Sequence, residues 1–125
     1  MAQLDVSVVA ADRQVWTGAA ASLVAATTEG EIGILSGHEP VLAVLRTGVV
    51  RIKSVDGEDI RVAVDGGFFS VDQNVVRVLS GAAKLASEID EASTRAELEQ
   101  AKTAQDTERE KVLAAHLEAL AAPRH

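Results

Sequence analysis

Residues 50–64 read VRIKSVDGEDIRVAV, and this stretch decides the fold class of the chain. On both sides of Asp56-Gly57, apolar residues alternate with polar ones, which is typical of a strand with one buried face. An Asp-Gly pair between two such runs predicts a two-residue hairpin turn of type I′, because glycine accepts the positive φ angle that this turn needs. We therefore expect two antiparallel strands joined at residues 56–57.

Similar short strand signals recur before and after this hairpin. Apolar and polar residues alternate from Leu4 to Val8, and Asp72-Gln73-Asn74 separates the apolar runs Phe68–Val71 and Val75–Leu79 in the manner of a second hairpin loop. Gly66-Gly67 predicts a bulge or a close approach between backbones. Many short strands with one polar face predict an antiparallel sandwich or barrel.

The composition changes near residue 86. All nine glycines precede this point, and after it Ala, Glu and Leu dominate while β-branched residues almost disappear. This is a change from residues that favour strands to residues that favour helices. The predicted fold class is α+β, with an N-terminal antiparallel β-sandwich over residues 1–86 and a C-terminal α-helical hairpin over residues 87–125.

Two capping-box patterns lie in the helical part, at Thr94–Glu97 and Thr107–Glu110. The second predicts a break near residues 103–107 and hence two helices, the later one ending before Pro123. A single continuous helix is the alternative that composition allows. One apolar stripe is predicted on the later helix. Its members are Val112, Leu113, Leu117 and Leu120.

Charge and composition exclude several classes of function. The formal net charge is -7, which opposes binding to phosphate backbones or anionic lipids. Only three aromatic residues are present, too few for stacking along single-stranded nucleic acid, and the lack of cysteine excludes disulfides and thiolate metal sites. No apolar run approaches the roughly 20 residues that span a bilayer, and the N-terminus lacks the pattern of a signal peptide. We expect the chain to reach a membrane only through partners.

The densest group of reactive side chains lies in Thr28–Pro40, TEGEIGILSGHEP. As an enzyme site, His38 would be a general base oriented by Glu31 or Glu39; as a metal site, the same groups would be ligands. The other two histidines lie in the helical part, and the glycines are not followed by the Gly-Lys-Ser/Thr of a phosphate loop. We interpret the segment either as a glycine-shaped loop with solvated carboxylates and one surface or capping histidine, or as a contact with other proteins, and predict no catalytic residue, metal or cofactor.

The run Glu29–Pro40 closely resembles the signature loop of the epsilon chains of bacterial F-type ATP synthases. Leu45–Ile52, Val64–Val71 and Val76–Leu79 resemble further landmarks of this family, in its order and spacing, so that the similarity covers about residues 3–85. The resemblance implies a non-catalytic central-stalk rotor subunit on the cytoplasmic face of the cell membrane. Such a subunit couples rotation of the c-ring and gamma to ATP synthesis in the alpha/beta head of a proton-translocating enzyme.

The resemblance also implies partners and contact residues. The sandwich would hold the gamma subunit and touch the polar loops of the c-ring. The candidate contact residues are Glu29, Glu31, Ile34 and His38, with Glu31 and His38 foremost. In many bacterial relatives the C-terminal helices extend toward the alpha and beta subunits and restrain ATP hydrolysis. The candidate regulatory residues on the helices are Asp90, Arg95, Arg109, Leu113 and Leu117.

The start of the helical part departs from the relatives that bind ATP, which resemble Ile/Leu-Asp-x-x-Arg-Ala. Here Ile89-Asp90 is separated from Arg95-Ala96 by two extra residues. Two residues turn a helix by about 200°, so Asp90 and Arg95 are not expected to share a face, and no ATP site is predicted. Ser36 stands where the loop of the family commonly has proline, which predicts a less rigid loop.

Two functions of other classes are alternatives to the rotor subunit. One is a free-standing β-sandwich adaptor or ligand-binding module with a helical docking tail. The other is a small hydrolase centred on His38 and Glu31.

Overall fold

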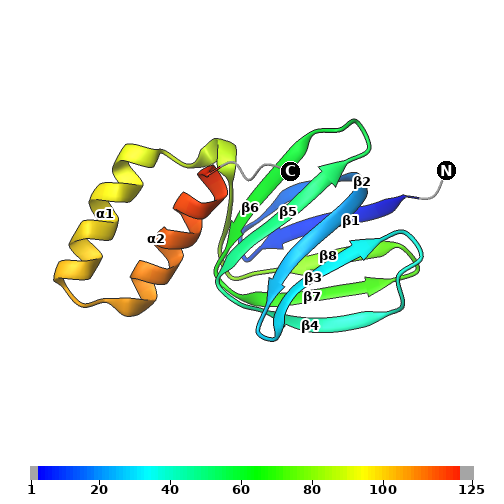
Figure 1. The fold of residues 1–125 in the computed structure, drawn as a ribbon, viewed down its shortest axis with the longest axis horizontal. Coiled ribbons are helices and arrows are strands. Elements are labelled where there is room, and N and C mark those ends of the chain that lie inside the picture. Colours follow the sequence, from blue (N-terminus) through cyan, green and yellow to red (C-terminus); the bar gives the residue numbers. More distant parts are fainter. Residues whose placement is uncertain (1–2, 122–125) are drawn as a thin grey trace.

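The computed structural model describes residues 3–121, in which nine strands are followed by two α-helices (Figure 1). The strands are β1 (Leu4–Ala10), β2 (Arg13–Thr27), β3 (Gly30–Leu35), β4 (Val41–Leu45), β5 (Gly48–Ser54), β6 (Asp59–Val64), β7 (Gly67–Asp72), β8 (Val75–Leu79) and β9 (Ala83–Leu85). The helices are the 3₁₀-helix η1 (Ala86–Glu88), α1 (Glu91–Thr103) and α2 (Thr107–Leu120). The predicted α+β class and the helical hairpin are confirmed. Pro123, before which the second helix was expected to end, lies outside the described residues.

The strands form two layers that share the long strand β2. One layer runs β9-β6-β5-β2, and β3 pairs with the second half of β2. The other layer runs β1-β8-β7-β4. The first half of β2 pairs with β1, its second half pairs with β3 and β5, and Thr27 at its end pairs with Leu45 of β4. The two layers are therefore joined into one hydrogen-bonded sheet.

The core lies between the two layers and follows from the alternation of the sequence. On β1, Leu4, Val6 and Val8 are almost completely buried, and the residues between them face outward. Phe69 is the largest fully buried side chain, and the rest of this core is Val, Leu, Ile and Ala. Burial of this apolar surface is the main force that holds the layers together.

One pairing is not antiparallel as expected. β8 runs parallel to β1, with Val6 opposite Val76. Strands joined by a tight turn must be antiparallel, but β1 and β8 are neighbours in space only, separated by six other strands in the chain. Local patterns therefore carry no information on the direction of this pair.

The turn between β5 and β6 differs from the predicted type I′. Lys53 pairs with Asp59, which leaves a loop longer than two residues, and only the glycine of the Asp56-Gly57 pair has a positive φ, at 90°. The hydroxyl of Ser54 accepts hydrogen bonds of 3.2 Å from the backbone N–H groups of Asp56 and Glu58. These bonds stabilise the longer loop, as expected for a turn completed by a left-handed glycine.

The predicted hairpin between β7 and β8 is confirmed. Its turn has the type I′ geometry that was predicted for the β5–β6 hairpin. Asp72 pairs directly with Val75, and the two residues between them have positive φ angles, 50° at Gln73 and 68° at Asn74. Asparagine tolerates this region of φ better than most residues. The type I′ turn therefore forms where the ladder leaves two residues unpaired.

The predicted close backbone approach occurs at Gly67. Its φ is 119°, and a Cβ atom added there would lie 2.0 Å from the carbonyl oxygen of Leu79 on the neighbouring strand β8. No side chain fits in this space, and an L-residue rarely adopts this φ. The start of β7 can therefore pair with the end of β8 only if this residue is glycine.

Gly67→Ala should lower the free energy of unfolding by about 2 kcal/mol or more, because backbone strain adds to the clash with Leu79. Gly81→Ala is the matched control, since a Cβ atom added at Gly81 would have no neighbour within 4 Å. Chemical denaturation of both variants measures the difference. Equal stability of the two variants would contradict the close approach.

Candidate functional site

The helical hairpin docks on the sandwich through small side chains of α2. Ala115 and Ala119 are buried against Val49 of β5 and Ala63 of β6, with Ile89 of the linker completing the cluster. These two strand residues point away from the main core, so α2 covers the outer face of the β5–β6 pair. Alanines allow the helix to approach the sheet closely, while the apolar area they bury is small.

Helix α1 packs on α2 and lies on the far side of it from the sandwich (Figure 1). Leu113 is fully buried but lies two residues from Ala115, which is about 200° around the helix. It therefore faces α1, where Thr94 and Ala101 are buried. Leu117 and Leu120 lie within about 40° of Leu113 around α2, so these three members of the predicted stripe share one side of the helix, and Leu120 also packs against the sandwich cluster.

The two helices begin at aspartates, not at the predicted capping boxes. Asp90 accepts hydrogen bonds from the backbone N–H and the hydroxyl of Ser93, which hold the pKa of its carboxyl below the ordinary value. Asp106 accepts one of 3.1 Å from the backbone N–H of Arg109. Both aspartates directly precede the first helical residue, where a carboxylate satisfies a free N–H group. The threonines of the predicted boxes therefore fall inside the helices.

A bidentate ion pair fixes the linker between sheet and helices. Two nitrogens of Arg13, at the start of β2, donate to the carboxylate of Glu88 at 2.8 and 3.0 Å. Glu88 also accepts a bond of 3.0 Å from the N–H of Leu85. The hydrogen bonds from Arg13 are the main reason why the pKa of Glu88 lies below its usual range. The last strand and η1 are thereby tied to β2.

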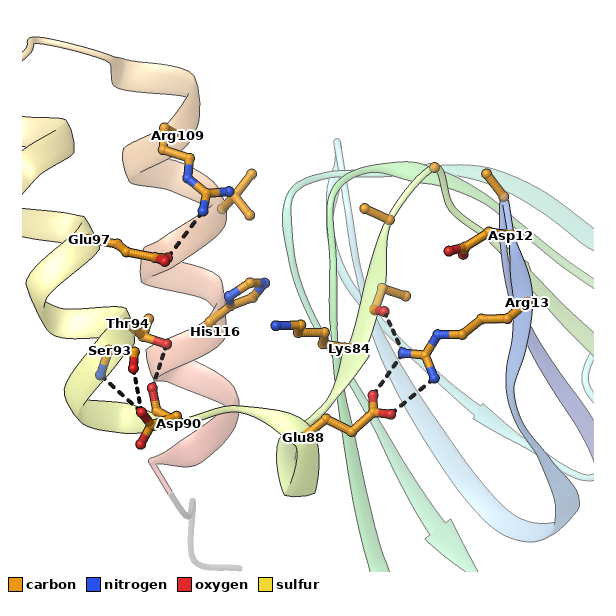
Figure 2. Close-up of a pocket in the computed structure, with 15 residues that line it drawn as sticks. Asp12, Arg13, Lys84, Glu88, Asp90, Ser93, Thr94, Glu97, Arg109 and His116 are labelled. Carbon is orange, nitrogen blue, oxygen red and sulfur yellow. Dashed lines mark hydrogen bonds and ion pairs between the residues drawn. The ribbon is translucent and has the colours of Figure 1, made fainter.

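A cavity of about 820 Å³ lies between the hairpin and the end of the sandwich (Figure 2). Its charged and titratable lining includes Arg13, Lys84, Glu88, Glu97, Arg109 and His116. His116 is half-buried on α2, and its pKa is lowered, first by burial and then by the positive charges of Lys84 and Arg109. The imidazole projects into the space that faces Lys84 (Figure 2).

Arg61 of β6 holds the other end of α2. Its guanidinium donates to the carbonyl oxygen of Ala121 at 3.3 Å, just beyond the last helical residue. A cation at this position is favourable because the carbonyl end of a helix carries a partial negative charge. Its Nε is buried and has no partner among the described residues. Arg61 is a second polar contact of the docked hairpin.

The predicted contact segment is not one loop. Residues 30–35 form β3, an additional strand beside β2, so Glu29 and Glu31 lie at one end of it and His38 lies beyond the other. The four residue steps from Glu31 to Leu35 already span about 13 Å. Sequence reasoning missed this strand because Gly30 and Gly33 are unusual in strands.

The remaining details of this segment separate its residues further. Ile34 is 1% exposed in the main core, so it is a packing residue and not an available contact. Glu31 pairs with Arg51 at 3.3 Å, whereas the ring Nδ1 of His38 lies 2.7 Å from the carbonyl oxygen of Glu39. Glu31 and His38 therefore do not form the acid–base pair of the hydrolase hypothesis.

The predicted regulatory residues on the helices occupy different environments. Arg95 is exposed and pairs with Glu91 at 2.8 Å, while Asp90 caps the helix, so the two do not converge, as the shifted spacing predicts. Arg109 pairs with Glu97 of α1 at 3.1 Å and reaches the cavity. Leu117 is half-buried, one turn from Leu113. Among these residues, only Asp90 and Arg109 line the cavity.

The structure reveals an apolar surface that sequence reasoning missed. Four large side chains point outward from three adjacent strands: Leu42, Val44, Phe68 and Leu79, which are 73%, 48%, 55% and 50% exposed. Val44, Phe68 and Leu79 are direct neighbours across β4, β7 and β8. We call these four residues the apolar face. The signal in the sequence was the continuous apolar run of β4, VLAVL, which does not alternate.

Across residues 3–121, no three histidine, cysteine, aspartate or glutamate side chains gather in a way that suits a metal ion. Neither α1 nor α2 has the length and apolar character needed to cross a membrane.

Comparison with known proteins identifies relatives over most of the chain. Residues 3–86 match the family described as ATP synthase, Delta/Epsilon chain, beta-sandwich domain. The ATP synthase epsilon chain of Streptomyces avermitilis is 46% identical over 121 residues, which cover 97% of this chain and 98% of the relative. That of Rhodococcus jostii is 48% identical over 99 residues, covering 78% and 81%.

Solved structures that resemble more than nine tenths of the chain include two from mitochondrial ATP synthases. A chain in the structure of the Euglena gracilis mitochondrial ATP synthase, which includes OSCP, F1 and the c-ring, superposes with a TM-score of 0.84 at 24% identity, covering 96% of this chain and 82% of that one. A chain of the central stalk and c-ring of the Tetrahymena thermophila mitochondrial ATP synthase gives 0.60 at 18% identity, covering 93% and 95%. At these identities, the likeness concerns the fold.

Ala119→Leu should release the hairpin while the sandwich stays folded, because overpacking this contact costs about 1–3 kcal/mol. Ala114→Leu is the matched control, since Ala114 is exposed on the same helix. Hydrogen exchange should show lost protection of α2 amides in the first variant only. If α2 stays equally protected in both, the alanine contact does not hold the hairpin.

Proposed function

Because the chain belongs to the family of ATP synthase epsilon chains, we propose that it is a rotor component of a proton-translocating F-type enzyme. In this role it couples rotation of the c-ring and gamma subunit to ATP synthesis in the alpha/beta head. It works as an accessory subunit with no active site of its own, held peripherally at the cytoplasmic face of the cell membrane by its partners. Its two-part structure, a rigid sandwich with a weakly attached hairpin, supports this proposal.

The apolar face is our candidate for the surface that binds gamma. Its centre is Phe68, which is flanked by Val44 and Leu79 on the neighbouring strands and is 55% exposed. Clustered exposed side chains of this size mark protein–protein contact sites on soluble domains, and aromatic residues contribute strongly at such sites. His38 precedes β4, whose Leu42 belongs to the apolar face, so we place His38 at the edge of the same contact.

The β2–β3 turn is our candidate for the contact with the polar loops of the c-ring. Glu29 and Glu31 are exposed there, on the opposite end of β3 from His38. Arg51 pairs with Glu31 at 3.3 Å, and the carboxylate stays partly exposed. Exposed carboxylates suit a polar contact between proteins. At such a contact, complementary charges guide the approach of the partners and fix their orientation, and they contribute less to affinity.

Phe68→Asp should weaken binding of the chain to purified gamma subunit by about 30-fold, the loss of roughly 2 kcal/mol typical of a central interface residue. Val55→Asp is the matched control, because Val55 is a similarly exposed apolar residue on the β5–β6 turn. Isothermal titration calorimetry measures both affinities. Equal binding by the two variants would exclude the apolar face as the gamma contact.

The hairpin is our candidate for a restraint on ATP hydrolysis by the complex. Its sheet contact is centred on two alanines, with Leu120 also packed against the cluster, and α1 packs on α2, so the pair can leave the sandwich together. Once released, α1 with its 13 residues would extend about 20 Å. The length and surface of the released hairpin suit insertion against the alpha and beta subunits. The proposed contacts are Arg95 on α1 and Arg109, Leu113 and Leu117 on α2.

Deletion of residues 88–125 should leave the sandwich folded and bound to gamma while ATP hydrolysis by the complex rises. We expect this because the main core contains strand residues alone. Thermal unfolding, gamma binding and the hydrolysis rate are to be compared with those of the full chain. An unchanged rate would argue against the restraint, and loss of cooperative unfolding would argue against residues 1–86 as an independent domain.

A further inference from the structure

His116 occupies a position where a change of charge would act on the docking of α2. It follows Ala115 directly and lies three residues before Ala119, the two alanines that contact the sandwich. Its imidazole is half-buried and faces the cavity between hairpin and sandwich (Figure 2). Protonation of this ring therefore destabilises the docked state of the hairpin.

The nearest charged groups oppose a positive charge on the ring. Lys84 faces it from β9, on the sandwich side, and Arg109 lies two helical turns earlier on α2. Lys84 is left behind when the hairpin moves away, whereas Arg109 moves with it. The repulsion between Lys84 and a charged His116 is thus specific to the docked state.

The acidic groups near the ring have other partners. Glu97 of α1 binds Arg109 at 3.1 Å, and Asp65, in the connection after β6, accepts a bond of 3.1 Å from the hydroxyl of Thr47. Their effects on His116 favour its charged form but are weaker than those of burial and the two cations. The ring therefore lacks a dedicated carboxylate to neutralise it.

Most of the other charged groups that line the cavity bind a partner other than the ring. Arg13 and Glu88 pair with each other, and Asp90 is bound to Ser93. Asp12 lies on the turn that precedes β2, beside Arg13. The residues of β5 and β6 in the docking cluster are uncharged, and the nearest basic group of β6, Arg61, holds the C-terminal end of α2. Among residues 3–121, no carboxylate forms an ion pair with His116.

We propose that protonation of His116 releases the helical hairpin from the sandwich, so that acidification favours the undocked form. The regulatory consequence, a stronger restraint on ATP hydrolysis at low pH, rests on the function proposed above. The release itself is a property of this chain alone.

The direction follows from proton linkage. In the docked state the pKa of His116 lies below its ordinary value of 6.5, and on release it returns toward that value. The docked state then binds fewer protons, so its advantage is fully present above about pH 6.5 and declines as the pH falls below it. One titrating group can change the docking equilibrium by at most about tenfold per pH unit.

Energy transfer between two dyes in the full chain tests the proposal. The chain has no cysteine, so Glu58→Cys on the β5–β6 turn and Ala104→Cys at the end of α1 label the sandwich and the hairpin uniquely. Between about pH 7.5 and pH 5.5, where histidine titrates, transfer in the otherwise unchanged chain should fall. His116→Gln, which keeps a polar side chain without a titrating group, should hold transfer constant.

Two further variants separate the charge of His116 from changes in packing. Lys84→Gln should reduce the pH response, because the docked ring then loses a repelling neighbour. Lys102→Gln removes an equal charge from an exposed site on α1 that does not line the cavity, and should leave the response intact. A constant signal in the unchanged chain, or an unaltered response in His116→Gln, would overturn the proposal. Neither result depends on whether the hairpin restrains hydrolysis.

Discussion

The shared strand β2 is the constraint on which the rest of the structure depends. Over 15 residues it pairs first with β1, then with β3 and β5, and finally with β4. Irregular pairing between Val8 and Val9 of β1, and between Ala20 and Ser22 of β2, allows the bend that such sharing needs. The same strand begins with Arg13, which binds the linker to the helices. The core and the attachment of the hairpin are thus built on one element.

The docked hairpin combines an anchored linker with a weak contact along α2. The ion pair of Arg13 and Glu88 lies where the sheet ends, and α1 lies beyond α2, so movement about η1 would carry both helices together. The contact itself buries two alanines against Val49, Ala63 and Ile89, and Leu120 packs against this cluster. Two states that differ by a few kcal/mol can be interchanged by a partner or a charge. A contact of large side chains would hold the docked state more strongly.

Much of this fold could be predicted from the sequence, and the failures have definite causes. Alternation identified the paired strands, and the absence of glycine after residue 86 identified the helices. The strand β3 was missed because its glycines fill positions on the outer surface where no side chain is needed. The caps were misplaced because an aspartate before the helix competes with a threonine within it. The direction of β8 against β1, and the outward direction of Phe68, depend on distant strands that no local pattern reports.

The carboxylates that hold the linker and the imidazole beside the docking contact respond differently to pH, and this difference determines how the hairpin would open. The pKa values of Glu88 and Asp90 are both lowered, by Arg13 and Ser93 respectively, so both carboxylates stay charged in mild acid. Their bonds stabilise the linker and the start of α1 above the ordinary carboxyl range and weaken only as the pH falls through and below it. The pKa of His116 is lowered from an ordinary value of 6.5, which is above the carboxyl range, and the ring lies beside the docking contact. Mild acidification would therefore act on the contact between α2 and the sandwich while the linker and the helix cap stay intact, so the hairpin would swing away as a folded unit.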